Sequence, residues 1–79
     1  MTHRYKAQTF RLFRGHRIPT RPPVVIEVGD KSSDRVIIAK AKQAVGWNGI
    51  QTHLQDLGDS FLLNPRSRPH TLLEVAFAS

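Results

Sequence analysis

The sequence predicts an α+β domain in which one helix packs on a mainly antiparallel five-stranded sheet, in the order β-β-α-β-β-β. Two observations support this class. Apolar residues recur at three- and four-residue spacing over residues 34–45, which is typical of an amphipathic helix. On both sides of that segment, short runs of β-branched and aromatic residues alternate with clusters of turn-forming residues. With 79 residues, the chain is expected to form a single small domain that buries only about 60% of its unfolded surface.

The part before the helix is expected to contain two strands. The first covers residues 5–14, where Thr, Phe and Leu favour extended backbone. Residues 15–23 are expected to form a long loop or an extended arm, because their three prolines cannot donate the hydrogen bonds of a sheet, and the part from Pro19 to Pro23 is expected to be mobile in the free protein. The second strand covers residues 24–28, in which alternate residues form one apolar row.

The helix is expected over residues 34–45, after a polar turn that offers Ser or Asp as its cap. Gly46 and Gly49 are expected to end it. They leave Trp47 free to fold back onto the core, and a role of Trp47 in binding stays open. The apolar stripe that faces the sheet consists of Ile37, Ile38, Ala41, Ala44 and Val45.

The part after the helix is expected to add three strands. Residues 50–57 and 61–63 form a hairpin around the turn at residues 58–60. Residues 64–69 form a second basic loop that is bounded by prolines. The last strand covers residues 71–77, where apolar residues alternate along one face.

The formal net charge of +6 is concentrated in the arginine-rich segment Arg4–Arg21. This segment holds six of the twelve Lys and Arg residues and none of the six Asp and Glu residues. Five of its six basic residues are Arg, whose side chain is suited to bidentate contacts with phosphate or carboxylate. The resulting field attracts polyanions or acidic protein surfaces. The candidate contacts are Arg4, Lys6, Arg11, Arg14, Arg17, Arg21, Arg66 and Arg68, with the aromatic residues Tyr5, Phe10 and Phe13, whose rings can stack on bases.

The other reactive residues do not predict a catalytic, metal or cofactor site. The four His residues are separated by 13, 37 and 17 positions, which matches no compact metal-ligand pattern, and the chain has no Cys. Asp30 and Asp34, and likewise Asp56 and Asp59, flank expected turns, where Asp is common for capping reasons alone. The five Gly residues are scattered, so they do not make a phosphate-binding loop. We therefore expect a protein that is not an enzyme and uses no metal or cofactor.

The apolar runs are too short for a membrane segment. None exceeds four residues, whereas a transmembrane helix needs roughly 18, and the N-terminal segment lacks the apolar stretch of a secretory signal. The absence of Cys fits a reducing compartment. These features predict a soluble, cytoplasmic protein that does not bind membranes.

One stretch also suggests a family. Residues 27–63 are expected to form a strand, a short polar turn, a helix bearing Ala and Lys, an exit bounded by Gly46 and Gly49, and a hairpin. This layout resembles small phage-encoded anti-CRISPR proteins, several of which have this length, lack Cys and place one helix between strands two and three of a five-stranded sheet. The resemblance implies a stoichiometric inhibitor of a host nucleoprotein machine. The arginine-rich N-terminal segment departs from that layout, and the resemblance assigns no site residues.

Two functions remain open. The first is a non-enzymatic binding protein that acts on nucleic acid or a nucleoprotein complex, with phosphate contacts that make binding strongly salt-dependent. The alternative is a protein–protein interaction module or homodimeric regulator whose basic surface meets an acidic protein surface. An ordinary structural role also stays open, because basic residues on edge strands guard sheets against aggregation.

Overall fold

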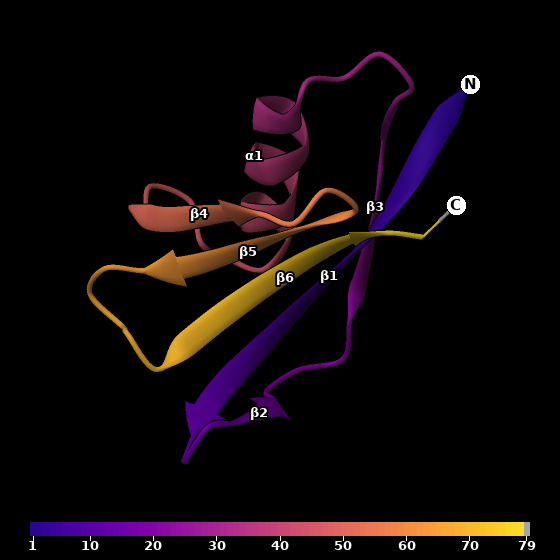
Figure 1. The fold of residues 1–79 in the computed structure, drawn as a ribbon. Helices are drawn as coiled ribbons and strands as arrows, with labels where there is room; N and C mark the ends of the chain where they lie inside the picture. Colours follow the sequence, from indigo (N-terminus) through magenta and orange to yellow (C-terminus); the bar gives the residue numbers. More distant parts are fainter. Residues whose placement is uncertain (79) are drawn as a thin grey trace.

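A computed structural model describes residues 1–78. Within this range the chain forms six strands, one helix and a single sheet, in which every pair of neighbouring strands is antiparallel (Figure 1). The predicted α+β class with one helix is confirmed, but the order is β-β-β-α-β-β-β, so the expectation of five strands was wrong. The elements are β1 (Thr2–Phe13), β2 (His16–Pro19), β3 (Val24–Gly29), α1 (Asp34–Ala44), β4 (Thr52–Asp56), β5 (Ser60–Pro65) and β6 (Thr71–Phe77).

The additional strand, β2, lies in the segment that was expected to be a loop. Arg14 and Gly15 both have positive φ, 52° and 80°, and form the two-residue turn between β1 and β2, as type I′ hairpin turns require. Pro19 occupies the last position of β2, at the outer side of the sheet, where its missing N–H removes little from the ladder. The following link is also attached to β1, because the Thr20 amide donates to the carbonyl of Thr9 at 3.1 Å.

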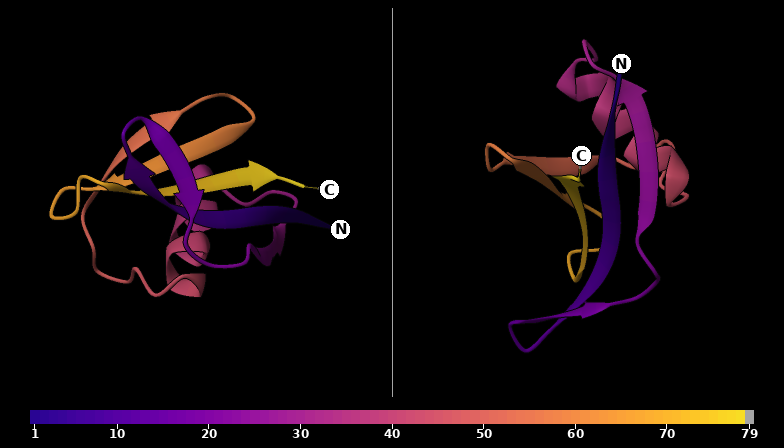
Figure 2. Two further views of the ribbon diagram at one scale, coloured as in Figure 1. Left: turned by 90° about the horizontal axis from the view of Figure 1, so that it is seen from below. Right: turned by 90° about the vertical axis from the view of Figure 1, so that its right-hand side faces the viewer.

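Strand β1 organises the sheet. The strand order is β2-β1-β6-β5-β4, and β3 pairs with β1 as well. Residues 2–7 of β1 pair with β3 and residues 10–13 pair with β2, both on one edge, while residues 5–11 pair with β6 on the other edge. Figure 2 shows β1 as a long curved strand that runs the length of the molecule and ends in the β1–β2 hairpin.

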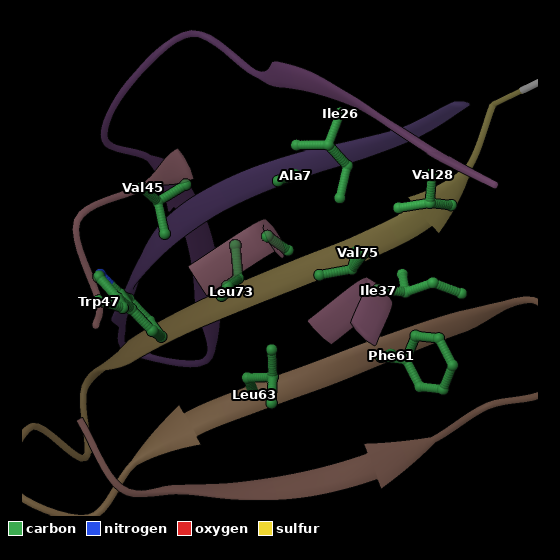
Figure 3. Packing of buried hydrophobic residues seen from close by; sticks show 11 residues of the cluster. Ala7, Ile26, Val28, Ile37, Val45, Trp47, Phe61, Leu63, Leu73 and Val75 are labelled. Atoms are coloured by element: carbon green, nitrogen blue, oxygen red, sulfur yellow. The ribbon is translucent and has the colours of Figure 1, made fainter. Parts of the chain in front are cut away.

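Helix α1 covers one face of the sheet and encloses the core with it. Ile37 and Ala41 on α1 are buried against residues of β1, β3, β5 and β6 (Figure 3). Ala44 was expected in the buried stripe but is exposed, because it lies at the edge of the buried arc, beside Lys40 and Gln43 in a surface hollow. The buried hydrophobic cluster consists of Ala7, Ile26, Val28, Ile37, Ala41, Val45, Trp47, Phe61, Leu63, Leu73 and Val75.

The end of α1 places Trp47 in the core. Gly46, at φ 77°, donates its amide to Gln43, and the Trp47 amide donates to the carbonyl of Lys42 at 2.7 Å. This pair of bonds is a Schellman motif, which reverses the chain at the helix end. Trp47 is only 7% exposed and lies at one end of the core cluster (Figure 3). Within the described residues, no helix has the length and apolar character needed to cross a bilayer.

Candidate nucleic-acid interface

Six of the eight predicted basic contacts lie at one end of the molecule. The β1–β2 hairpin and the β5–β6 connection are neighbours there, because Arg11 of β1 pairs with Thr71 at the start of β6 (Figure 1). We call this region the basic end and define it as residues 10–21 and 66–71. Neither segment contains Asp or Glu. Its arginines are Arg11, Arg14, Arg17, Arg21, Arg66 and Arg68.

Four of the six acidic residues lie toward the other end of β1, where both termini are (Figure 1). The Asp30 amide donates to the carbonyl of Met1 at 3.3 Å, and the Phe77 amide donates to the carbonyl of Asp59 at 3.4 Å. The other two Asp residues border the same two connections, β3–α1 and β4–β5. Charge is therefore separated along β1, which gives the molecule a preferred orientation toward a polyanion.

The two remaining acidic residues form ion pairs on the sheet face that points away from α1. Arg4 Nε lies 3.0 Å from Glu27 Oε1, and Arg17 Nη1 lies 3.5 Å from Glu74 Oε2. All four side chains are partly exposed, so each pair stabilises the fold by no more than about 1 kcal/mol. Lys6 is exposed on the same face, opposite Val25, and lies outside the basic end.

The three predicted aromatic contacts lie in different surroundings. Tyr5 packs against the core cluster and meets Phe77 edge to face, with 5.5 Å between ring centroids, so its ring has a structural role. Phe10 is half-buried, and the Arg17 guanidinium lies 5.9 Å from its ring centroid. Phe13 is 51% exposed near the hairpin turn, with the Arg14 guanidinium 5.3 Å from its ring. Phe13 is therefore the aromatic residue most open to a partner.

A polar hollow joins the two basic segments. Arg21 and Arg68 line it together, although they are far apart in the sequence, and Trp47 forms part of its wall. Thr9 Oγ1 and Thr20 Oγ1 are hydrogen-bonded at 2.7 Å, so one hydroxyl donates and the accepting hydroxyl keeps its own hydrogen for another group. We call this site the threonine–arginine hollow. It is lined by Thr9, Thr20, Arg21, Val45, Gly46, Trp47, Arg68 and Thr71.

The size and chemistry of this hollow suit small anionic groups such as phosphates. Its volume of about 280 Å³ is slightly below the 300–1,000 Å³ of most small-molecule sites. Its polar donors are guanidinium and hydroxyl groups, which bind phosphate oxygens. Sequence reasoning missed its three threonines, because they come from β1, the β2–β3 link and the start of β6 and share no local pattern.

The acidic residues considered for catalysis have structural contacts. Asp56 Oδ1 accepts the Gly58 amide at 2.8 Å within the β4–β5 turn, and Asp34 lies in the first turn of α1. Among residues 1–78, no group of three or more His, Asp or Glu side chains is arranged to hold a metal ion.

Comparisons with family models, with curated proteins and with solved structures found no match for this chain. The anti-CRISPR layout that the sequence resembles has its helix between strands two and three of five, whereas α1 follows the third of six described strands. The distribution of charge and exposed apolar surface is therefore the basis for proposing a function.

Proposed function

We propose that this protein is a non-enzymatic binding protein for nucleic acid or a nucleoprotein complex, and that the basic end is its contact surface. The observation that supports this proposal is the gathering of six arginines from two distant segments, with the acidic residues either ion-paired on the outer face or placed toward the other end. A fold that only protected its edges from aggregation would not need this separation of charge.

The contacts follow from the positions of the side chains. Arg21 and Arg68 at the threonine–arginine hollow, with exposed Arg66 nearby in sequence, would each take up a backbone phosphate. Each such contact displaces condensed counterions, so affinity should fall steeply as salt rises. Phosphate contacts of this kind position the ligand and contribute little sequence preference by themselves.

Inhibition of a host CRISPR effector by a phage-encoded protein is one role of this kind. It would need a stoichiometric complex with a nucleoprotein, formed in the cytoplasm. Only the resemblance over residues 27–63 supports this narrower role, since the basic end lies outside that stretch.

A second candidate function is binding to an acidic protein surface or formation of a homodimer. Phe13 and Ile18 are 51% and 46% exposed among the arginines of the hairpin, and an apolar anchor beside Arg is typical of protein–protein hot spots. Strand β4 ends the sheet and exposes Leu54, so its free edge is available for pairing with a second copy.

The test of the main proposal is a binding titration of the full chain against short labelled DNA and RNA over a salt series. We expect binding at low salt and a linear fall of log affinity with log salt. Absence of binding to every nucleic acid at low salt would overturn the proposal. A pull-down from the native host, with and without nuclease, then separates the two candidates, because partners that resist nuclease indicate a protein target.

A further inference from the structure

The tip of the β1–β2 hairpin projects beyond the body of the molecule as a two-stranded ribbon, because β6 pairs with β1 only as far as Arg11 (Figure 2). Four residue pairs join its strands, from Phe10 and Pro19 to Phe13 and His16, and every residue of β2 is exposed. Phe10 and Arg11 are also paired with β6, and the Leu12 amide donates to the carbonyl of His70 at 2.7 Å. The two-stranded part therefore runs from Leu12 to the turn at Arg14, which is about 7 Å at about 3.4 Å per residue. The tight turn at Arg14 and Gly15 keeps its tip narrow.

We propose that this hairpin inserts into the major groove of B-form DNA, while the threonine–arginine hollow stays outside the groove and meets the phosphate backbone. This inference rests on the proposed function and names its ligand as a DNA duplex.

The dimensions of the ribbon fit this groove. Paired strands lie about 4.8 Å apart, and the B-DNA major groove, about 12 Å wide and about 8.5 Å deep, admits a two-stranded β-ribbon. A two-stranded tip of about 7 Å, with its side chains reaching further, can enter a groove of this depth. The major groove of an RNA duplex is too narrow for side chains to read, and a single strand offers no groove.

The chemistry of the ribbon also fits base edges. Phe13, Ile18 and Arg11 line one shallow hollow on the same face of the hairpin. In the major groove, apolar side chains contact the thymine C5 methyl group and Arg donates to the O6 and N7 atoms of guanine. The exposed Phe13 and Ile18 can therefore contact thymine methyl groups, while the neighbouring Arg11 can donate to guanine.

Contacts on the ribbon and contacts at the hollow should differ in salt dependence. Phe13 and Ile18 displace no counterions when they touch a methyl group, so their removal lowers affinity without changing the salt slope. Arg21 and Arg68 contact phosphates in this arrangement, so their removal makes the slope shallower.

The first experiment compares three ligands of matched sequence and length: a DNA duplex, one of its single strands and an RNA duplex. The full chain should bind the DNA duplex at least about tenfold more tightly than either other ligand at the same salt. Equal or tighter binding of the single strand or the RNA duplex would overturn groove insertion and leave the proposed function standing. Failure to bind any of the three would instead overturn the proposed function itself.

The second experiment replaces thymine by uracil in the DNA duplex, which removes only the C5 methyl group. The parent protein should lose about fourfold in affinity for each methyl group that it contacts. The double variant Phe13→Thr/Ile18→Thr, which keeps strand-forming side chains, should bind the thymine duplex more weakly and show no further loss with uracil.

The matched control is Val25→Thr/Leu54→Thr, which makes the same kind of change at exposed strand positions away from the hairpin. It should keep the parent's response to uracil, and thermal melts should show that both double variants are folded. A parent protein that binds thymine and uracil duplexes equally would overturn insertion into the major groove.

Discussion

Strand β1 passes through two regions of opposite character. Along its middle, Ala7 is 1% exposed and Thr9 is 6% exposed under the helix, whereas further on Arg11 is exposed and Phe13 is 51% exposed. The backbone pairing is continuous through both regions, so the change is made by the side chains and by what covers them. Helix α1 covers the packed body and does not cover the basic end.

The same two regions differ in how they use charge. In the packed body, Arg4 pairs with Glu27 across two strands, and the Lys40 ammonium group donates to a backbone carbonyl of Glu27. At the basic end, Arg17 pairs with Glu74 of β6, and other guanidinium groups lie beside hydroxyl groups and exposed rings in segments that contain no carboxylate side chain. Burial should therefore decide stability in the body, and charge should decide ligand binding at the basic end.

The largest expected effect is on the stability of the packed body. Ala41 is completely buried on α1, so Ala41→Asp places a carboxylate without a partner between helix and sheet. This costs several kcal/mol, which can remove most of a margin of about 5 kcal/mol in so small a domain. The matched control is Ala39→Asp, the same change on the exposed face of the same helix. If the two variants melted together, the buried face of α1 would be assigned incorrectly.

The second effect is on binding at the basic end. The triple variant Arg21→Gln/Arg66→Gln/Arg68→Gln should melt like the parent, because exposed charges contribute little stability. Its salt slope for DNA should be shallower by about 2.7, since each phosphate contact contributes about 0.9.

The control for the triple variant removes three positive charges elsewhere, in Lys31→Gln/Arg35→Gln/Lys40→Gln. Both variants have the same net charge, so any effect of total charge is equal in the two. We expect the control to keep the parent's salt slope in a fluorescence anisotropy titration. Equal slopes in the two triple variants would show that DNA responds to net charge alone and that the basic end is not its contact surface.

The two regions also differ in how far they could be predicted from the sequence. The helix and the last strand were predicted well, because the periodic apolar residues at 34–45 and 71–77 reflect packing on one face, which leaves a local pattern. Strand β2 was missed because three prolines between residues 15 and 23 indicate a loop. Arg14 and Gly15 nevertheless allow a tight hairpin, and Pro19 pairs with Phe10 at the sheet edge, where its missing N–H removes little from the ladder.

The candidate site was predicted in composition but not in arrangement. The sequence indicates the arginines, yet only the strand pairing of the fold places Arg4 opposite Glu27 and brings Arg21 and Arg68 to one hollow. Register depends on cross-strand contacts between distant segments, so a single sequence carries little information about it. For the same reason, Tyr5 could not be recognised beforehand as a packing residue.

A smaller effect is expected where the two regions meet, at the threonine–arginine hollow. Thr20→Val removes the hydroxyl that bonds to Thr9, whose side chain is almost buried. The loss should cost about 1–2 kcal/mol, because a buried hydroxyl is left without its partner. Thr20→Ser keeps the hydroxyl and serves as the control in chemical denaturation. If Val and Ser variants unfolded at the same denaturant concentration, the hydrogen bond would have no net effect on stability.

The smallest effect is expected at the hairpin turn, where stability and binding should change in opposite directions. Arg14 adopts a left-handed backbone conformation, φ 52°, which disfavours most L-residues but is tolerated by Asn. Arg14→Asn should therefore stabilise the fold by about 0.5 kcal/mol and raise Tm by about 3 °C. The same change removes a positive charge from the part of the hairpin that we place in the DNA groove, so affinity for the duplex should fall.

Arg14→Gln removes the charge without relieving the backbone, so it should bind as weakly as the Asn variant while melting like the parent. If the Asn variant melted no higher than the Gln variant, the Arg14 conformation would carry no strain. If both bound DNA as tightly as the parent, the tip of the hairpin would lie outside the interface.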